Sequence, residues 1–277
     1  MLKQRVITAL LLMAVLLPSL FAQATWPFAL LSLLLIAAAG WEWGRLNGAG
    51  AASAALGGVL AALSAAALYA GWDAAPPRAV WWAALLVWVI GGAYTLSRGP
   101  AGWPAVPAPL RWLIGIALLW TAWLALAAAK AIGINFILSV FCLVWAADIA
   151  AYFGGRAFGK RKLAPGISPG KSWEGVWGGM LGALLLAALW LWFDRSFTVD
   201  SPGLFSRLDD RFGWGLGALV VLFLAAMSVV GDLFESLVKR SAGAKDSSGL
   251  LPGHGGVLDR VDALLPVVPI ALAMVSY

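Results

Sequence analysis

Apolar residues run along this chain in long, nearly uninterrupted stretches, and polar residues gather in the short segments between them. The stretches are about 20 residues long, which is the length a helix needs to cross the hydrocarbon core of a bilayer. Backbone polar groups cannot stay unpaired in lipid, so these stretches are expected to be helices. The weak alternation of a membrane β-barrel is absent from the sequence. Nine spans are predicted, at 6–22, 27–41, 51–71, 79–97, 110–129, 132–155, 174–193, 213–231 and 262–277.

Composition supports this interpretation and sets the expected fold. Hydrophobic residues make up 62% of the chain and charged residues only 12%, and the mean hydropathy is +0.89. We therefore predict an all-α fold, a polytopic integral membrane helical bundle with about nine transmembrane helices. The net charge of +6 could suggest a nucleic-acid partner, but its distribution offers a better explanation, and no nucleic-acid partner is expected.

The basic residues lie predominantly on one side of the predicted membrane. If the N-terminus is cytoplasmic, only five of the 19 Lys and Arg fall outside, namely Arg78, Lys130, Arg195, Arg207 and Arg211. The remaining residues of this set lie on the cytoplasmic side, which is the asymmetry of the positive-inside rule. We therefore expect a multi-pass protein of the cell's inner (plasma) membrane whose basic loops face the cytoplasm.

The first 24 residues allow two interpretations. Their basic start, apolar core and Ala22-x-Ala24 ending are typical of a cleavable signal peptide. They also suit a first span that is retained, which is the expectation here, although the charge distribution does not decide between the two. The single cysteine, Cys142, lies inside a predicted span, excludes an intramolecular disulfide and is expected to be a packing residue.

Ionisable residues divide the chain into two predicted regions. Residues 1–131 are expected to form an N-terminal transmembrane scaffold, and residues 132–277 a C-terminal transmembrane catalytic region. In the scaffold, Glu42 is expected to form a local pair with Arg45. Seven tryptophans near predicted span ends are expected to anchor the chain at the membrane interface: Trp26, Trp41, Trp43, Trp72, Trp81, Trp103 and Trp112.

The second region carries an acidic residue inside a predicted span. An ionisable group such as Asp148 at membrane depth normally faces a partner or a polar cavity. Two interpretations remain open: a buried carboxylate paired with a basic residue of another helix, or a functional group.

A basic loop follows, at 153–175. Its five basic residues stand among Gly, Ser and Pro, which build bends that present backbone N–H groups to anions. An ordinary basic cytoplasmic loop is the alternative. Ser172 could cap the next helix, and the Gly-x-x-x-Gly pairs at 175–179 and 178–182 favour close helix packing.

Carboxylates recur around the last polar segment. Asp232, Glu235 and Lys239 share one helix face by their spacing, and Asp259 and Asp262 share another. Clustered carboxylates without sulfur ligands favour a hard cation such as Mg²⁺, and one histidine with one intramembrane cysteine argues against zinc. Neighbouring cations and glycines suit polyphosphate, although no P-loop is present. This arrangement at the cytoplasmic membrane surface predicts phosphoryl or nucleotidyl transfer to a lipid, with ion transport and a structural role as alternatives.

The polar run is also specific in sequence. "SLVKRSAGAKDSSGLLPGHGGVLDRVD" (236–262) contains Ser-x-x-Lys-Arg, a Lys-Asp pair, Pro-x-His-Gly-Gly and Asp-Arg-x-Asp in that order. This pattern resembles the signature of the phosphatidate cytidylyltransferases, also called CDP-diacylglycerol synthases. The resemblance extends to Asp148 and to "GRAFGKRKLAPGISPGKSWEG" (155–175) and so covers roughly the second half. The first spans match only in hydrophobicity and in "EW".

The resemblance implies a reaction in which CTP and phosphatidate give CDP-diacylglycerol and pyrophosphate, and it implies a homodimer that uses Mg²⁺, with K⁺ also possible. It implies catalytic roles for Asp232, Asp259, Lys239 and Arg260. Substrate binding is expected at Ser168, Lys171, Ser172, Arg240, Lys245, His254, Gly255 and Gly256. The metal ligands are expected among Asp232, Asp259, Asp262, Asp148 and Asp246, with the first two as the principal carboxylates and His254 as a positioning group.

Two other functions remain open from the sequence. A polyprenol kinase or an ether-lipid cytidylyltransferase would use CTP with similar site chemistry. A transporter would also be polytopic with a buried Asp148, but broken helices or an internal repeat near the midplane would be expected, and neither is seen.

Overall fold

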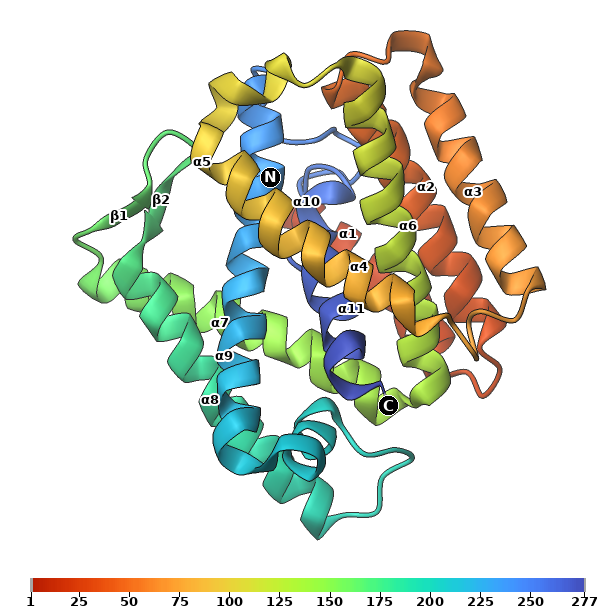
Figure 1. Cartoon of the computed structure of the whole chain (residues 1–277), viewed down its shortest axis with the longest axis vertical. Coiled ribbons are helices and arrows are strands. Elements are labelled where there is room, and N and C mark those ends of the chain that lie inside the picture. Colours follow the sequence, from red (N-terminus) through yellow and green to blue (C-terminus); the bar gives the residue numbers. More distant parts are fainter. Residues whose placement is uncertain (1, 277) are drawn as a thin grey trace.

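The computed structural model describes residues 2–276, apart from the side chains of Leu2, Lys3 and Arg5. Positions 1 and 277, the outer limits of the two predicted regions, lie outside this range. Helices dominate the architecture (Figure 1). The elements are α1 (Leu2–Phe21), α2 (Trp26–Leu46), η1 (Gly50–Ala52), α3 (Ser53–Tyr69), α4 (Arg78–Leu86), η2 (Val87–Gly91), α5 (Gly92–Gly102), η3 (Trp103–Ala105), α6 (Ala108–Ile132), α7 (Ile134–Phe158), β1 (Lys162–Ala164), β2 (Ser168–Ser172), α8 (Trp173–Ser196), α9 (Leu204–Ser241), α10 (Leu258–Val261) and α11 (Leu264–Val275).

Long apolar helices confirm the predicted helical bundle. Within the described range, seven helical segments are long and apolar enough to cross a membrane, and they coincide with the second to eighth predicted spans. The largest extensions beyond the predicted spans are those of Arg78–Ala105 and Leu204–Ser241. Inside these two helices the chain turns at glycines with positive φ, Gly99 (65°) and Gly213 (72°), a conformation that only glycine adopts without strain.

The first and ninth predicted spans correspond to shorter helices. The apolar part of α1 is Val6–Phe21, and α11 has 12 residues, of which most are buried. Helix α11 packs against α4, α6, α7 and α9, and so lies in the interior of the bundle (Figure 1). Its apolar sequence therefore faces other helices, and hydropathy alone does not distinguish that environment from lipid.

Helices α7 and α8 make the most extensive packing contact of the described chain. A Cβ atom on Gly178 would come within 3.0 Å of the Ala150 carbonyl oxygen and 3.3 Å of the Gly154 Cα atom. A Cβ on Gly179 would come within 2.8 Å of the Ala147 oxygen. The close packing predicted from the Gly-x-x-x-Gly pairs is therefore confirmed, because these backbones approach each other where no side chain intervenes.

Three tryptophans expected at the membrane interface are buried instead. Trp43 and Trp103 are each 3% exposed and Trp81 is 1% exposed. Trp43 stacks on Phe234 of α9, with ring centroids 6.0 Å apart, and Trp103 meets the same ring edge-on at 5.6 Å. The expectation of interface anchors was wrong for these three, because their positions near helix ends turn toward the core.

One two-stranded sheet departs from the all-α prediction. Strands β1 and β2 pair antiparallel, with Lys162 opposite Ser172 and Ala164 opposite Ser168. This hairpin projects from the bundle on the side away from α3 (Figure 1). It carries part of the basic loop to which the family resemblance extends, and it brings that loop beside α9.

Candidate active site

A cavity of about 540 Å³ opens between α7, α8, α9 and the hairpin. Helix α7 contributes Asp148, Tyr152 and Arg156, and α9 contributes Asp232. From the loop and the start of α8 come Ser168, Lys171, Ser172, Gly175 and Val176. Five of the predicted site residues therefore line one cavity, although they come from three separate segments: Asp148, Ser168, Lys171, Ser172 and Asp232.

Local hydrogen bonds shape the hairpin wall of this cavity. The Ser172 Oγ accepts a hydrogen bond from the Gly175 N–H at 3.2 Å, which confirms the predicted helix cap. The Glu174 carboxylate accepts N–H groups of Lys160 and Arg161 and pairs with the Arg161 Nε at 3.1 Å. These contacts fix the basic loop to the first turn of α8, so that Lys171 points inward.

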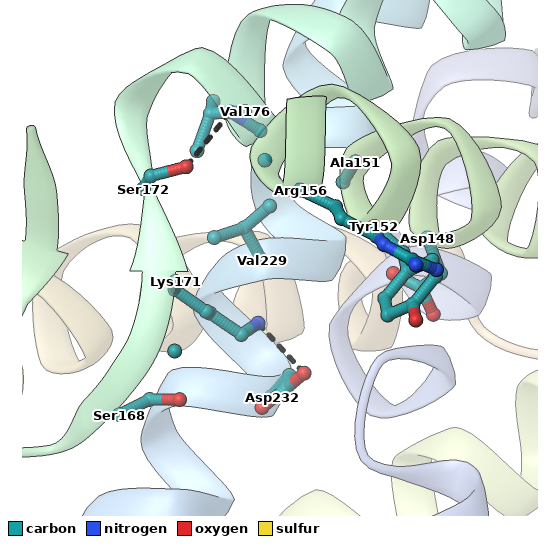
Figure 2. A pocket seen from close by; sticks show the side chains of 13 residues that line it. Asp148, Ala151, Tyr152, Arg156, Ser168, Lys171, Ser172, Val176, Val229 and Asp232 are labelled. Atoms are coloured by element: carbon teal, nitrogen blue, oxygen red, sulfur yellow. Dashed lines mark hydrogen bonds and ion pairs between the residues drawn. The ribbon is translucent and has the colours of Figure 1, made fainter. Parts of the chain in front are cut away.

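Lys171 and Asp232 form an ion pair across the cavity (Figure 2), with 2.6 Å between Nζ and Oδ2. Both side chains are partly exposed to the cavity, at 25% and 32%. The Ser236 hydroxyl also donates to Asp232 Oδ1 at 3.3 Å. A cation from the hairpin therefore meets a carboxylate of α9 at a position that solvent reaches.

Two further carboxylates lie near Asp232. Asp148 is close enough to experience the charges of both Lys171 and Asp232. Asp262, between α10 and α11, is partly buried, and its carboxyl group lies close enough to Asp232 for their charges to interact. Three carboxyl groups thus lie close together near the Lys171 ammonium group, and a further cation would relieve their repulsion.

A second cluster is built around Asp259 of α10. Its Oδ1 accepts a hydrogen bond from Lys239 Nζ at 2.5 Å, and its Oδ2 accepts the N–H groups of Ser247 and Gly256 at 2.9 and 2.8 Å. Burial would raise the pKa of Asp259, but these hydrogen bonds outweigh it and lower the pKa to about 2. Lys239 also pairs with the buried Glu235, so one ammonium group lies between the carboxyl groups of Asp259 and Glu235.

Glu42, which the sequence had assigned to a local pair with Arg45, is bound to this second cluster instead. Its carboxylate is fully buried and accepts hydrogen bonds from the Ser247 and Ser248 hydroxyls. The Arg45 guanidinium lies 4.7 Å from the Trp41 ring centroid. The local-pair interpretation was therefore wrong, and a residue from the first region contacts the signature segment.

The other predicted site residues lie along the signature loop. Arg240 donates to the carbonyl oxygens of Ile167 and Ala244, and Arg260 donates to the His254 carbonyl oxygen at 3.0 Å. Gly255 adopts a φ of 84°, which makes the turn between His254 and Gly256 possible. The side chains of Lys245 and Asp246 are exposed at the surface of this loop.

The carboxylate oxygens near the cavity are candidate ligands for a metal ion. Among the described residues, no three His, Cys, Asp or Glu side chains already form a cation site by themselves. Asp148, Asp232 and Asp262 nevertheless supply oxygen donors of the type that Mg²⁺ prefers, and that ion usually completes its shell with water and substrate phosphate oxygens. The donor chemistry fits a magnesium ion bound together with a phosphorylated substrate.

Comparison with known proteins finds a family model and a relative that match nearly the whole chain. The model of the cytidylyltransferase family matches residues 3–277. A phosphatidate cytidylyltransferase of Pseudomonas aeruginosa is 40% identical over 284 aligned residues, which cover 99% of this chain and 97% of that protein. Proteins of the same name from Haemophilus influenzae and Bacillus subtilis are 52% and 39% identical over about half of this chain, covering 44% and 46% of their own lengths.

Proposed function

The chain belongs to the cytidylyltransferase family, and from this premise we propose that it is a phosphatidate cytidylyltransferase. The proposed reaction transfers the cytidylyl group of CTP to phosphatidate, giving CDP-diacylglycerol for phospholipid synthesis. A phosphate oxygen of phosphatidate attacks the α-phosphorus of CTP, the bond from that phosphorus to the bridging oxygen breaks, and pyrophosphate leaves. The full-length similarity to a phosphatidate cytidylyltransferase carries this proposal.

The cavity supports the proposal through its charges and its position. Lys171 and Arg156 line it together with the hydroxyls of Ser168 and Ser172, and these groups suit phosphate oxygens. Apolar helices α7, α8 and α9 form the walls, so a lipid phosphate could reach the cavity while its acyl chains remain among them. Positive charge is needed there because both substrates are anionic and repel each other.

Asp232, Asp262 and Asp148 are the residues proposed to hold Mg²⁺ beside this cavity, and K⁺ is a further proposed cofactor. A bound divalent ion would neutralise charge on the phosphate oxygens during the transfer. Asp259 and Asp246 stay predicted ligands. The Asp259 carboxylate already accepts hydrogen bonds from Lys239, Ser247 and Gly256. Lys171 shares Asp232 with any ion that binds, and so couples the metal to the hairpin.

The proposed setting is the inner membrane of the cell, with the cavity on its cytoplasmic side. The positive-inside distribution of Lys and Arg supports this orientation. It also supports about nine spans, with α1 and the segment containing α11 added to the seven long helices. A homodimer is proposed from the family resemblance.

The test is an assay on the purified full-length chain with CTP labelled at either the α- or the γ-phosphate. Cytidylyl transfer moves the α-label into a phosphatidate-derived lipid and releases the γ-label in pyrophosphate. Transfer of the γ-label to a polyprenol would instead identify a kinase, and α-label entering only an ether lipid would identify that cytidylyltransferase. Omission of Mg²⁺ in parallel reactions tests the metal proposal, which fails if turnover continues unchanged after chelation.

A further inference from the structure

The buried carboxylate of Glu42 has no role in the reaction described so far. We infer that Glu42 is a positioning residue of the active site, which holds the signature loop and α10 in the arrangement that presents Asp259 and Arg260. The inference rests on the proposed function for its effect on turnover. Its structural part, that Glu42 orders residues 244–258, stands on geometry alone.

Four donors from one loop converge on this side chain, which is 0% exposed. The hydroxyls of Ser247 and Ser248 donate to it at 3.0 and 2.5 Å. The N–H groups of Val257 and Leu258 donate at 2.9 and 2.8 Å. Val257 and Leu258 form the amino end of α10, where N–H groups lack partners within the helix. Glu42 therefore caps the helix that carries Asp259.

The contact also fixes Asp259 through a shared neighbour. The Ser247 hydroxyl lies 3.0 Å from a carboxylate oxygen of Glu42 and 3.0 Å from Asp259 Oδ2. Because the Ser247 N–H also binds Asp259, one serine joins the two carboxylates from opposite ends of the chain. A change at Glu42 is therefore expected to reach Asp259 without touching it.

Steric fit makes this arrangement specific. A Cβ atom on Gly256 would lie 2.0 Å from the Ser247 Oγ and 2.4 Å from the Glu42 Oε1. The loop therefore approaches Glu42 so closely that only glycine fits at position 256. This close approach places the Gly256 N–H at 2.8 Å from Asp259.

The end of α2 that carries Glu42 is itself held rigidly. The Trp43 Nε1 donates to the Arg111 carbonyl oxygen at 2.8 Å, and the Trp43 ring stacks on Phe234. One turn further, the Asn47 Oδ1 accepts the Trp103 Nε1 at 2.8 Å. Phe234 lies between Asp232 and Glu235 in α9, so the same aromatic contacts position Glu42 relative to the acidic face of α9.

A carboxylate suits this position better than any neutral group of the same size. It offers two oxygens that only accept, whereas a glutamine side chain offers one such oxygen and places two N–H groups against donors. Glu42→Gln therefore leaves buried donors unpaired while it preserves the shape of the side chain. This substitution separates the hydrogen-bonding role from packing.

The test compares Glu42→Gln with wild type and with Arg45→Gln in the full-length purified protein. Arg45 lies one turn away, is exposed and contacts Trp41 rather than the loop, so its variant is the matched control. We expect kcat of Glu42→Gln to fall roughly 10- to 100-fold. A smaller rise in KM for CTP is expected as well, because the loop that Glu42 orders carries the predicted substrate-binding residues, whereas Arg45→Gln should change neither constant. Peptides spanning 244–258 should exchange their amide hydrogens faster than in wild type.

Ser248→Ala provides a second variant that removes only one of the four donors and preserves the rest of the site. In the double variant that combines Glu42→Gln and Ser248→Ala, the fold-loss in kcat should be smaller than the product of the two single-variant losses, because both substitutions act on one contact. Unchanged amide exchange in Glu42→Gln, or multiplicative losses in the double variant, would overturn the inference. A wild-type protein without cytidylyl transfer would instead refute the proposed function, and the exchange result would still decide the ordering role.

Discussion

The Nζ atom of Lys171 lies 2.6 Å from the Oδ2 atom of Asp232, although one residue belongs to the hairpin and the other to α9. Both side chains line the same cavity (Figure 2). The pair places a phosphate-binding cation beside the carboxylate that is proposed to hold a metal. The two partners can therefore be tested separately, since loss of each should affect a different step.

Asp232→Asn should abolish turnover while the protein remains folded. The substitution removes a negative oxygen donor for Mg²⁺ and leaves the size of the side chain unchanged. Turnover is measured with labelled CTP, and folding by the thermal transition of the purified protein. Asp210→Asn, an exposed residue near the start of α9, is the control and should retain activity. Wild-type turnover in Asp232→Asn would remove this residue from the proposed metal site.

Lys171→Met should raise the KM for a phosphate-bearing substrate by roughly tenfold, because one charge-assisted hydrogen bond is lost. Steady-state kinetics at varied CTP and varied phosphatidate identifies the substrate that is affected. Lys160→Met is a matched control, since this lysine belongs to the same loop and its side chain is exposed outside the cavity lining. Equal effects of the two substitutions would indicate only a general role for loop charge.

Asp259 should stabilise the fold at neutral pH and lose this contribution in acid. Its pKa is lowered from an ordinary value of 3.8 to about 2 in the folded protein. A lowered pKa contributes stability that is present above pH 4 and is lost as the pH falls toward 2. At about 1.4 kcal/mol for each pKa unit, the contribution is roughly 2 kcal/mol.

Thermal unfolding measured between pH 6 and about pH 3 checks this prediction. In Asp259→Asn the acid dependence should flatten, and turnover should be lost because Lys239 and the loop lose their shared acceptor. An acid dependence as steep in the variant as in wild type would assign the effect to other carboxylates. Near-normal turnover would remove Asp259 from the proposed catalytic residues.

Gly256→Ala should destabilise the signature loop and reduce turnover at least about tenfold, because the added methyl group would overlap Ser247 and Glu42. Gly249→Ala is the control within the same loop, since a Cβ there meets nothing within 4 Å. Amide exchange and turnover are measured for both variants. Tolerance of alanine at position 256 would show that the loop can move away from Glu42.

Trp103→Phe should lower the free energy of unfolding by about 1–3 kcal/mol, because the Asn47 Oδ1 loses its buried donor. Trp26→Phe, at a ring that is 64% exposed, should have little effect. Thermal unfolding of both variants compares the two sites. Equal stability of both would argue that the Trp103 hydrogen bond contributes nothing net.

Local features of the sequence predicted the helices, the Ser172 cap and the glycine contacts of α7 and α8, because each depends on neighbouring positions. Hydropathy also located the seven long helices, but it did not show that most of α11 is buried among other helices, since protein interior and lipid favour the same residues. The buried tryptophans were misassigned for a related reason. Proximity to a helix end was clear from the sequence, but the direction of the ring was not.

The role of Glu42 could not be predicted because its partners lie about 200 positions away in the chain. Arg45, three positions on, offered a local partner and therefore the simpler interpretation. The signal available was the single acidic residue of α2, which is the Glu of the "EW" shared with the family. The gathering of Asp148, Lys171 and Asp232 was expected from the resemblance, whereas their common cavity required the fold.

The glycine contact between α7 and α8 limits how substrates can reach the cavity. The backbones of these two helices pack directly against each other at the glycines. Separating the helices would therefore lose many close contacts, and we expect their relative position to stay fixed. The opposite side consists of a short hairpin that contacts α9 through the Lys171–Asp232 ion pair and through Arg240, which donates to the Ile167 carbonyl oxygen. We therefore expect the opening for a lipid to widen by movement of the hairpin, which would break the Lys171–Asp232 ion pair and the Arg240–Ile167 hydrogen bond.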